Sequence, residues 1–205
     1  MNQAYSLGLA RVGEDVVVWP KAKIVSPGKI TIGNSVIIDD FVFIMGGVNT
    51  VIGSFVHIAS FTSVTGGGEL IMEDFSGLSG GVRVYTGNED YTGKFMTNPT
   101  VPYPYRIPER SGVVIRKHAI VGANSVILPG VTIGEGAVVG ANSMVTKDCR
   151  PWTVYFGSPA KEIKRRRGDR IHELEEQLRK EVYDESGNYI PKCRRNRSEM
   201  TGGSR

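Results

Sequence analysis

Three histidines are the side chains of this sequence best suited to proton transfer near neutral pH, because the ordinary pKa of imidazole lies close to that range. They are His57, His118 and His172. His57 lies between Val56 and Ile58 in the segment VHIAS. A strand that buries both aliphatic neighbours turns His57 outward, where a substrate could meet it. We therefore expect a catalytic role for His57, a substrate-binding role for His118, and a surface position for His172.

Two adjacent carboxylates, Glu89 and Asp90, are the next candidates for a catalytic role. They lie in the segment TGNEDYTG. Either carboxylate could accept a proton or hold an ammonium group, and burial would raise its pKa toward the range that a base needs. Simple solvation of a loop is the alternative for both. Tyr91 and Arg106 lie nearby in the chain, and we expect them to contact the substrate.

These candidates belong to a long irregular segment, residues 85–114, that we call the arm. Beyond Tyr85 it carries three tyrosines, Tyr91, Tyr103 and Tyr105, and four prolines, Pro99, Pro102, Pro104 and Pro108. A loop of this length inside a compact fold is usually functional or disordered. The prolines and aromatic residues favour order, so we expect the arm to leave the body of the protein and help to wall an active site.

A six-residue repeat on both sides of the arm predicts the elements that position these residues. Helical faces recur near 3.6 residues and strand faces every two, so neither explains this period. A short strand with one inward aliphatic residue, followed by a tight corner and repeated three times, closes a triangular coil. We therefore predict an all-β parallel β-helix whose interior is filled by its own side chains. The recurring aliphatic residues are Ile32, Ile38, Ile44, Ile52, Ile58, Val64, Met72, Leu78, Val84, Ile115, Val121, Ile127, Ile133, Val139 and Val145.

The remaining segments divide into a first coil, a helix and a tail. Residues 1 to about 30 should form an irregular coil or cap, because Pro20, Pro27 and Gly28 interrupt the repeat. Residues 169 to about 183 have the apolar spacing of an amphipathic helix, which we expect to pack on the coil or on a neighbouring subunit. The residues from about 191 onward should be disordered. We therefore divide the chain into a β-helix domain, 1–166, and a helix with a basic tail, 167–205.

Composition narrows the function classes. With 205 residues, 40% of them hydrophobic, the chain can form one sizeable core. No apolar segment is long enough to cross a bilayer, so we expect a cytoplasmic protein with no membrane partner. The basic runs at 161–167 and 192–197 are not accompanied by an aromatic platform or a known nucleic-acid-binding motif. We therefore expect no nucleic-acid partner. Cys149 and Cys193 predict no disulfide, and Cys149 has no activating base nearby in the sequence.

The segment VGANSVILPGVTIGEGAVVGANSMVTKD, followed by PWTVYFGSPAKEIKRR, carries a resemblance to a known family. It is similar to the end of the coil and the adjoining cofactor segment of left-handed parallel β-helix acyltransferases, the hexapeptide-repeat enzymes, and especially of bacterial sugar acetyltransferases. The resemblance covers roughly residues 12–166. It implies a left-handed coil, acetyl-CoA as cosubstrate, and a homotrimer whose active sites lie in clefts between neighbouring chains.

The resemblance also implies where acetyl-CoA would bind. Its pantetheine arm would lie along small residues that permit close backbone approach. Its anionic nucleotide end would meet the basic segment, whose cations can make charge-assisted contacts to phosphate. The small residues are Ala123, Gly140 and Ala141, and the residues at the nucleotide end are Ser158, Lys161, Lys164 and Arg165.

The arm separates two branches of that family. In the hydroxyl-acetylating enzymes the corresponding loop contributes a catalytic histidine, and residues 85–114 contain none. The segment EDFSGLSGGVRVYTGNEDYTGKFMTNPTVP instead resembles bacterial transferases acting on nucleotide-linked amino sugars of surface polysaccharides. An amine is the stronger nucleophile and needs less help from a base. We therefore expect N-acetylation of an amino sugar, with sugar O-acetylation as the alternative.

Two other functions are compatible with the predicted fold. One class of zinc-dependent carbonic anhydrase has the same triangular β-helix, but its zinc site needs three converging imidazoles. We expect His118 to have no histidine partner nearby, and we therefore expect no metal. A non-catalytic assembly module would need neither the arm nor the basic segment.

Overall fold

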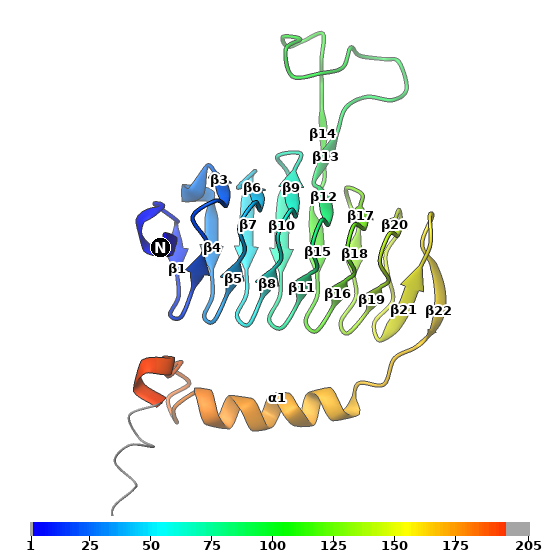
Figure 1. The fold of residues 1–205 in the computed structure, drawn as a ribbon. Helices are drawn as coiled ribbons and strands as arrows, with labels where there is room; N and C mark the ends of the chain where they lie inside the picture. Colours follow the sequence, from blue (N-terminus) through cyan, green and yellow to red (C-terminus); the bar gives the residue numbers. More distant parts are fainter. Residues whose placement is uncertain (1, 196–205) are drawn as a thin grey trace, which may run out of the picture.

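The structure is a computed structural model that describes residues 2–195, and its body is a stack of short strands wound into one continuous coil (Figure 1). Three parallel sheets form the sides of this coil. The first contains β1 (Arg11–Val12), β4 (Ile30–Ile32), β7 (Asn49–Ile52), β10 (Glu69–Met72), β15 (Val113–Ile115) and β18 (Thr132–Ile133). The third contains β3 (Lys23–Val25), β6 (Phe43–Met45), β9 (Ser63–Thr65), β12 (Arg83–Tyr85), β17 (Val126–Ile127) and β20 (Met144–Val145).

The second sheet is longer because it also contains a terminal hairpin. It is formed by β2 (Val17–Val18), β5 (Ile37–Ile38), β8 (His57–Ile58), β11 (Gly77–Leu78), β16 (Ile120–Val121), β19 (Val138–Val139), β21 (Thr153–Phe156) and β22 (Lys161–Arg165). The last two strands pair in antiparallel fashion. Two short 3₁₀ turns, η1 (Ala4–Ser6) and η2 (Pro27–Lys29), lie in the first 30 residues.

The six-residue repeat lines the interior as predicted. Each recurring aliphatic residue is at most 2% exposed. Successive coils stack in register, so that Ile58, Leu78, Val121 and Val139 form one continuous column. Because these side chains fill the interior, a ligand must bind to the outer surface of the coil. The parallel β-helix expected from the sequence is confirmed.

The prediction of an irregular first coil is wrong. Strands β1, β2 and β3 pair in parallel with β4, β5 and β6, which makes the first coil as regular as the second. Pro20 lies in a turn between strands, while Pro27 and Gly28 lie in η2. These prolines and this glycine do not interrupt the strands, because they lie outside them, where the missing N–H of proline removes no bond from the strand pairing.

Bulky residues occupy one corner of the coil in a backbone conformation that usually favours glycine or asparagine. Phe55, Phe75 and His118 all have positive φ, between 58° and 61°. Their rings stack, with centroids 4.7 Å apart for the phenylalanine pair and 5.1 Å apart for Phe75 and His118. His118 therefore continues the stack formed by the two phenylalanine rings. Ring stacking across successive coils offsets the cost of positive φ at each corner.

The arm leaves the body between β12 and β15, as predicted, and projects away from it (Figure 1). Its stem is a short antiparallel pair, β13 (Gly87–Asn88) and β14 (Glu109–Arg110). The stem starts against Gly66, which has a φ of 102°. A Cβ on Gly66 would lie 2.3 Å from the backbone nitrogen of Gly87. Only glycine at position 66 therefore permits this close approach.

The predicted helix is present as α1 (Asp169–Val182), and it lies alongside the coil (Figure 1). Glu175 is 7% exposed and contacts the coil through His118, with 2.7 Å between Oε2 and Nε2. Lys117 lies 2.7 Å from the other carboxylate oxygen of Glu175. Arg179 bonds both Glu175 and Asp74. Polar contacts therefore hold the helix on its own coil.

The charge of Glu175 should make the docking of α1 dependent on pH. Burial alone would raise the pKa of Glu175, but hydrogen bonds from Lys117, Arg179 and His118 outweigh burial and lower the pKa from 4.5 to about 2. A carboxyl group with a lower pKa in the folded chain stabilises it at a pH above the unfolded value. That contribution is lost as the pH falls through the folded value.

We expect Glu175→Gln to lower the free energy of unfolding most strongly at neutral pH. The difference from the wild type should shrink as the pH falls from 4.5 toward about 2, because both chains then carry a neutral side chain. Urea unfolding at several pH values measures this difference. Glu173→Gln is the matched control, because Glu173 is exposed and pairs with Arg170 on the same helix. A difference that does not change with pH would contradict the assignment.

The prediction of disorder from about residue 191 is wrong for the part of the tail that the structure describes. Pro191 is buried, and residues 192–195 form a helical turn. The backbone nitrogen of Lys192 donates to Asp15, and Arg195 lies 3.7 Å from the same carboxylate. The tail therefore returns to the first coil. The rest of the predicted disordered tail, 196–205, lies outside the described residues.

Among residues 2–195, no helix has the length and apolar character required to cross a lipid bilayer.

Candidate active site

His57 lies on the outside of the second sheet, as the sequence predicted. Its side chain is 56% exposed, and its Nε2 lies 3.0 Å from Oδ2 of Asp39. Asp39 directly follows β5, the strand that pairs with β8, so one coil supplies the carboxylate and the next supplies the imidazole. A carboxylate in this position can fix the orientation of the imidazole ring.

A hollow of about 330 Å³ adjoins this pair, and Asp39 forms part of its wall. The other lining residues are Trp19, Asp40 and Ser60. The sequence interpretation missed Asp39. The repeat aligns Ile38 with Ile58 in successive coils, so Ile37 lies opposite His57 and Asp39 lies two residues further along the same chain segment. This alignment is the signal that could have identified Asp39.

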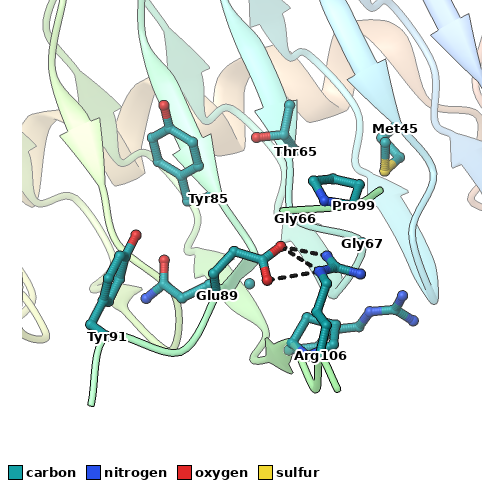
Figure 2. A pocket seen from close by; sticks show the side chains of 13 residues that line it. Met45, Thr65, Gly66, Gly67, Tyr85, Glu89, Tyr91, Pro99 and Arg106 are labelled. Carbon is teal, nitrogen blue, oxygen red and sulfur yellow. Dashed lines mark hydrogen bonds and ion pairs between the residues drawn. The ribbon is translucent and has the colours of Figure 1, made fainter. Parts of the chain in front are cut away.

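A second cavity, of about 500 Å³, lies where the arm meets the body (Figure 2). Three of the predicted site residues, Glu89, Tyr91 and Arg106, are brought together in its wall. Figure 2 shows Glu89 and Arg106 pointing toward one another across the cavity. The complete lining is Met45, Thr65, Gly66, Gly67, Tyr85, Gly87, Asn88, Glu89, Tyr91, Pro99, Arg106, Pro108 and Arg110.

The electrostatics of the arm do not support a carboxylate base. Arg106 bonds both oxygens of Glu89 and thereby lowers the pKa of that carboxyl group. Asp90 accepts hydrogen bonds from the hydroxyl and backbone nitrogen of Thr92 and from the backbone nitrogen of Phe95, which also lower its pKa. The expectation that burial would raise these pKa values is wrong. Both carboxylates organise the arm, and neither holds protons readily enough to serve as a base near neutral pH.

Arg110 is a cation of the arm cavity that the sequence interpretation did not single out. It lies in β14, at the base of the arm, and its guanidinium lines the cavity beside Gly67. Within residues 2–195 its side chain forms no ion pair or hydrogen bond, whereas the guanidinium of Arg106 is engaged by Glu89. Arg110 is therefore the more available of the two arginines for an anionic ligand.

His118 does not join either cavity, contrary to the expectation of a substrate-binding residue. It is 7% exposed because α1 covers it, and its Nε2 contacts Glu175. The expectation that it has no histidine neighbour is also wrong, since the ring centroid of His172 lies 5.9 Å away. The helix brings His172 there across 54 residues of sequence, which no local pattern shows. His172 is exposed, as predicted.

The small residues expected along a cofactor groove lie at one corner of the last coils. Ala123 is partly exposed and Ala141 is exposed. Gly140 is different, because a Cβ at this position would lie 2.5 Å from the ring of Phe156. The absence of a side chain at Gly140 therefore makes room for Phe156 of the same chain. It also leaves the backbone of this surface open to close approach by a ligand.

The basic residues expected at the nucleotide end lie on the terminal hairpin. Lys161, Lys164 and Arg165 belong to β22 and are exposed, and Ser158 lies exposed in the turn that precedes it. Arg165 also donates to the hydroxyl of Thr153, 3.0 Å away. Arg166 has a structural role instead, because it donates to the carbonyl oxygens of His118 and Gly136.

Comparison with known proteins agrees with this architecture. The bacterial transferase hexapeptide family (six repeats) matches residues 112–147. A dTDP-4-amino-4,6-dideoxy-D-glucose acyltransferase of Escherichia coli is 41% identical over 174 residues, which is 84% of this chain and 90% of that protein. The chain belongs to the hexapeptide-repeat sugar acyltransferases.

Solved structures extend the similarity to three dimensions. AntD, an N-acyltransferase from Bacillus cereus in complex with dTDP and 3-hydroxybutyryl-CoA, has a TM-score of 0.81 and 41% identity, covering 88% of this chain and 98% of AntD. A variant of AntD, 40% identical, was solved with dTDP-4-amino-4,6-dideoxyglucose and coenzyme A. A hexapeptide-repeat acetyltransferase from Vibrio cholerae, 24% identical with a TM-score of 0.55, shares the fold.

Covalent catalysis through a cysteine is not supported in this acyltransferase. Cys149 is buried at the end of the coil, and burial, together with the charge of Asp148, raises the pKa of its thiol to about 12. A thiol with this pKa is protonated near neutral pH and is therefore a poor nucleophile. The sequence likewise offered no activating base near Cys149.

Proposed function

We propose that this acyltransferase transfers an acetyl group from acetyl-CoA to the amine of a nucleotide-linked amino sugar. One observation carries the proposal. An exposed imidazole, paired with a carboxylate, lies on the outer surface of the coil in a chain that is 41% identical to an amino-sugar acyltransferase over 84% of its length. dTDP-4-amino-4,6-dideoxyglucose is the first acceptor to test, because a variant of AntD was solved with it. The product would serve bacterial surface polysaccharide synthesis, in the cytoplasm.

His57 is the proposed base. With Nε2–H donated to Asp39, the lone pair on Nδ1 is free to accept a proton. The neutral amine attacks the thioester carbonyl and forms a C–N bond. The proton released from nitrogen passes to His57, the C–S bond breaks, and the imidazolium returns the proton to the leaving thiolate. The products are the amide and free coenzyme A, and the proposed reaction requires no metal.

The outer surface of the last coils is the proposed site for acetyl-CoA. Ala123, Gly140 and Ala141 would lie against the pantetheine arm, and Phe156, which packs on Gly140, would form one wall. The exposed basic residues of β22 would meet the anionic nucleotide end of the cofactor. These are Lys161, Lys164 and Arg165, with Ser158 beside them.

A homotrimer is part of the proposal because the candidate residues of a single chain lie in two separate places. The pair of His57 and Asp39 lies on the second sheet, and the arm cavity lies at the stem formed by β13 and β14. An arm projecting from one chain can reach the outer surface of its neighbour. The acceptor would then be held by Tyr91, Arg106 and Arg110, and the base would come from another chain.

Arg110→Ala is expected to raise KM for the nucleotide sugar by about 10- to 100-fold with a much smaller change in kcat, because a charge-assisted bond to phosphate is lost. Steady-state kinetics at saturating acetyl-CoA measure both constants. Glu109→Gln is the control, because Glu109 is the exposed neighbour of Arg110 in β14 and does not line the cavity. An unchanged KM for Arg110→Ala would remove Arg110 from the acceptor site.

The function itself is tested by incubating the purified protein with acetyl-CoA and a panel of acceptors while following thiol release. We expect turnover with dTDP-linked amino sugars and none with the matching 4-hydroxy sugars. Turnover with hydroxyl acceptors alone would favour O-acetylation. AntD was solved with 3-hydroxybutyryl-CoA, so this donor belongs in the same assay. Faster turnover with 3-hydroxybutyryl-CoA would show that it, and not acetyl-CoA, is the preferred donor. Absence of thiol release with every pair of donor and acceptor would refute the proposal.

A further inference from the structure

Three potential metal ligands converge where α1 lies on the coil, outside the proposed active site. They are His118 from the coil and His172 and Glu175 from the helix. One ligand atom from each lies within 4.8 Å of the other two. His172 and Glu175 are three positions apart on α1, a spacing that places both on one face of a helix. Two imidazoles and one carboxylate form a common protein ligand set for Zn²⁺.

The two oxygens of Glu175 are divided between the cations and the imidazole. Oε1 lies 2.7 Å from Nζ of Lys117 and 2.5 Å from Nε of Arg179. Oε2 lies 2.7 Å from Nε2 of His118. The nearby cations therefore occupy one oxygen and leave the other facing the imidazole. Hydrogen bonds to the oxygen that is not coordinated are the usual outer-shell support of a carboxylate ligand.

Burial and exposure within this cluster also suit an ion. His118 and Glu175 are buried, so their positions are fixed by packing, whereas His172 is exposed and leaves a route from solvent. Trp152 lies edge-on to His172, with 5.0 Å between ring centroids, and forms an aromatic wall. Glu135 lies at the outer side, with its Oε1 3.9 Å from Nε2 of His172. A fourth ligand can therefore come from Glu135 or from water.

We propose that His118, His172 and Glu175 bind a divalent ion of the Zn²⁺ type, and that this ion fastens α1 to the coil. The ion would replace the hydrogen bond between His118 and Glu175. Ligand atoms around a tetrahedral zinc lie about 3.3 Å apart, so this pair must separate by about half an ångström. The exposed ring of His172 can turn to complete the set. The ion is structural, because these residues lie apart from His57 and from the arm cavity.

The test is zinc titration of the full-length, untagged protein after treatment with a chelator. Calorimetry should show one Zn²⁺ per chain, and a hundredfold excess over Kd should raise Tm by about 5 °C or more. Co²⁺ added in place of Zn²⁺ should give the visible absorption of a tetrahedral site. Fluorescence of Trp152 reports binding independently of activity, because its ring packs against His172.

His172→Ala is the decisive variant. It removes an exposed ligand without opening the core, so the variant should fold, and circular dichroism checks that it does. We expect at least a tenfold weaker Kd for Zn²⁺ and loss of the Tm increase. His57→Ala is the matched control, and its zinc binding should equal that of the wild type. Unchanged zinc binding in His172→Ala, loss in His57→Ala, or less than one ion per wild-type chain would each overturn the proposal.

Discussion

Replacing His57 with alanine is expected to lower kcat for acyl transfer by about 10²- to 10⁴-fold, with KM for both substrates nearly unchanged. In the proposed mechanism the imidazole accepts the amine proton only as the C–N bond forms, so it contributes little to ground-state binding. Steady-state kinetics with the acceptor found in the panel measure the effect. Added imidazole should restore part of the lost turnover, which a purely structural role of His57 would not explain.

In the proposed mechanism Asp39 acts through His57, so we expect its substitution to lower kcat less than His57→Ala does, by an amount that depends on which side chain replaces it. Asp39→Asn should lower kcat, and Asp39→Glu should retain more activity than Asp39→Asn because a carboxylate can still orient the ring. Val51→Ala is the control, because Val51 is partly buried on the outer side of the first sheet. Wild-type kcat in His57→Ala would show that the amine needs no base from this residue and would defeat the site assignment.

The largest effect on stability is expected at the centre of the coil. Leu78 is 1% exposed and is stacked between Ile58 and Val121 in the column of the second sheet. Leu78→Ala should lower the free energy of unfolding by about 2–5 kcal/mol, because it removes buried methyl groups and leaves a cavity that stacked coils cannot easily close. Urea unfolding followed by circular dichroism measures this change.

Ile37→Ala provides the matched comparison for Leu78→Ala. Ile37 lies in the same sheet but points outward and is 40% exposed, so its truncation should cost less than about 1 kcal/mol. Equal costs for the two substitutions would mean that the interior column does not dominate stability. A shallower dependence on urea in Leu78→Ala would instead show that the coils no longer unfold together.

The fold was predictable because each coil repeats one local rule. An aliphatic residue every six positions must be buried, and only a three-sided coil brings all of them inward. The same rule turns His57 outward, between buried Val56 and Ile58. The prediction fails at the first coil, because its prolines and glycine suggest breaks in the strands, whereas they lie at corners. The repeat therefore tolerates proline and glycine at corners better than it does in strands.

The electrostatic state of the arm was not predictable from its composition. Glu89 and Arg106 are 17 positions apart, and the loop between them determines that they meet. Asp90 is engaged by backbone groups, which no count of charged residues reveals. The sequence placed these residues in one segment correctly, and Tyr91 and Arg106 do share a cavity. It could not show which groups neutralise one another.

The sequence by itself determined the coil, the arm, the helix and the outward direction of His57, because each depends on residues a few positions apart. Only the tertiary structure decided the partners: Asp39 beside His57, and Glu175 beside His118 and His172. Such contacts depend on how coils stack and on where α1 lies against them. Their energies are small beside the burial of the aliphatic columns, so the pattern that dictates the fold carries little record of them.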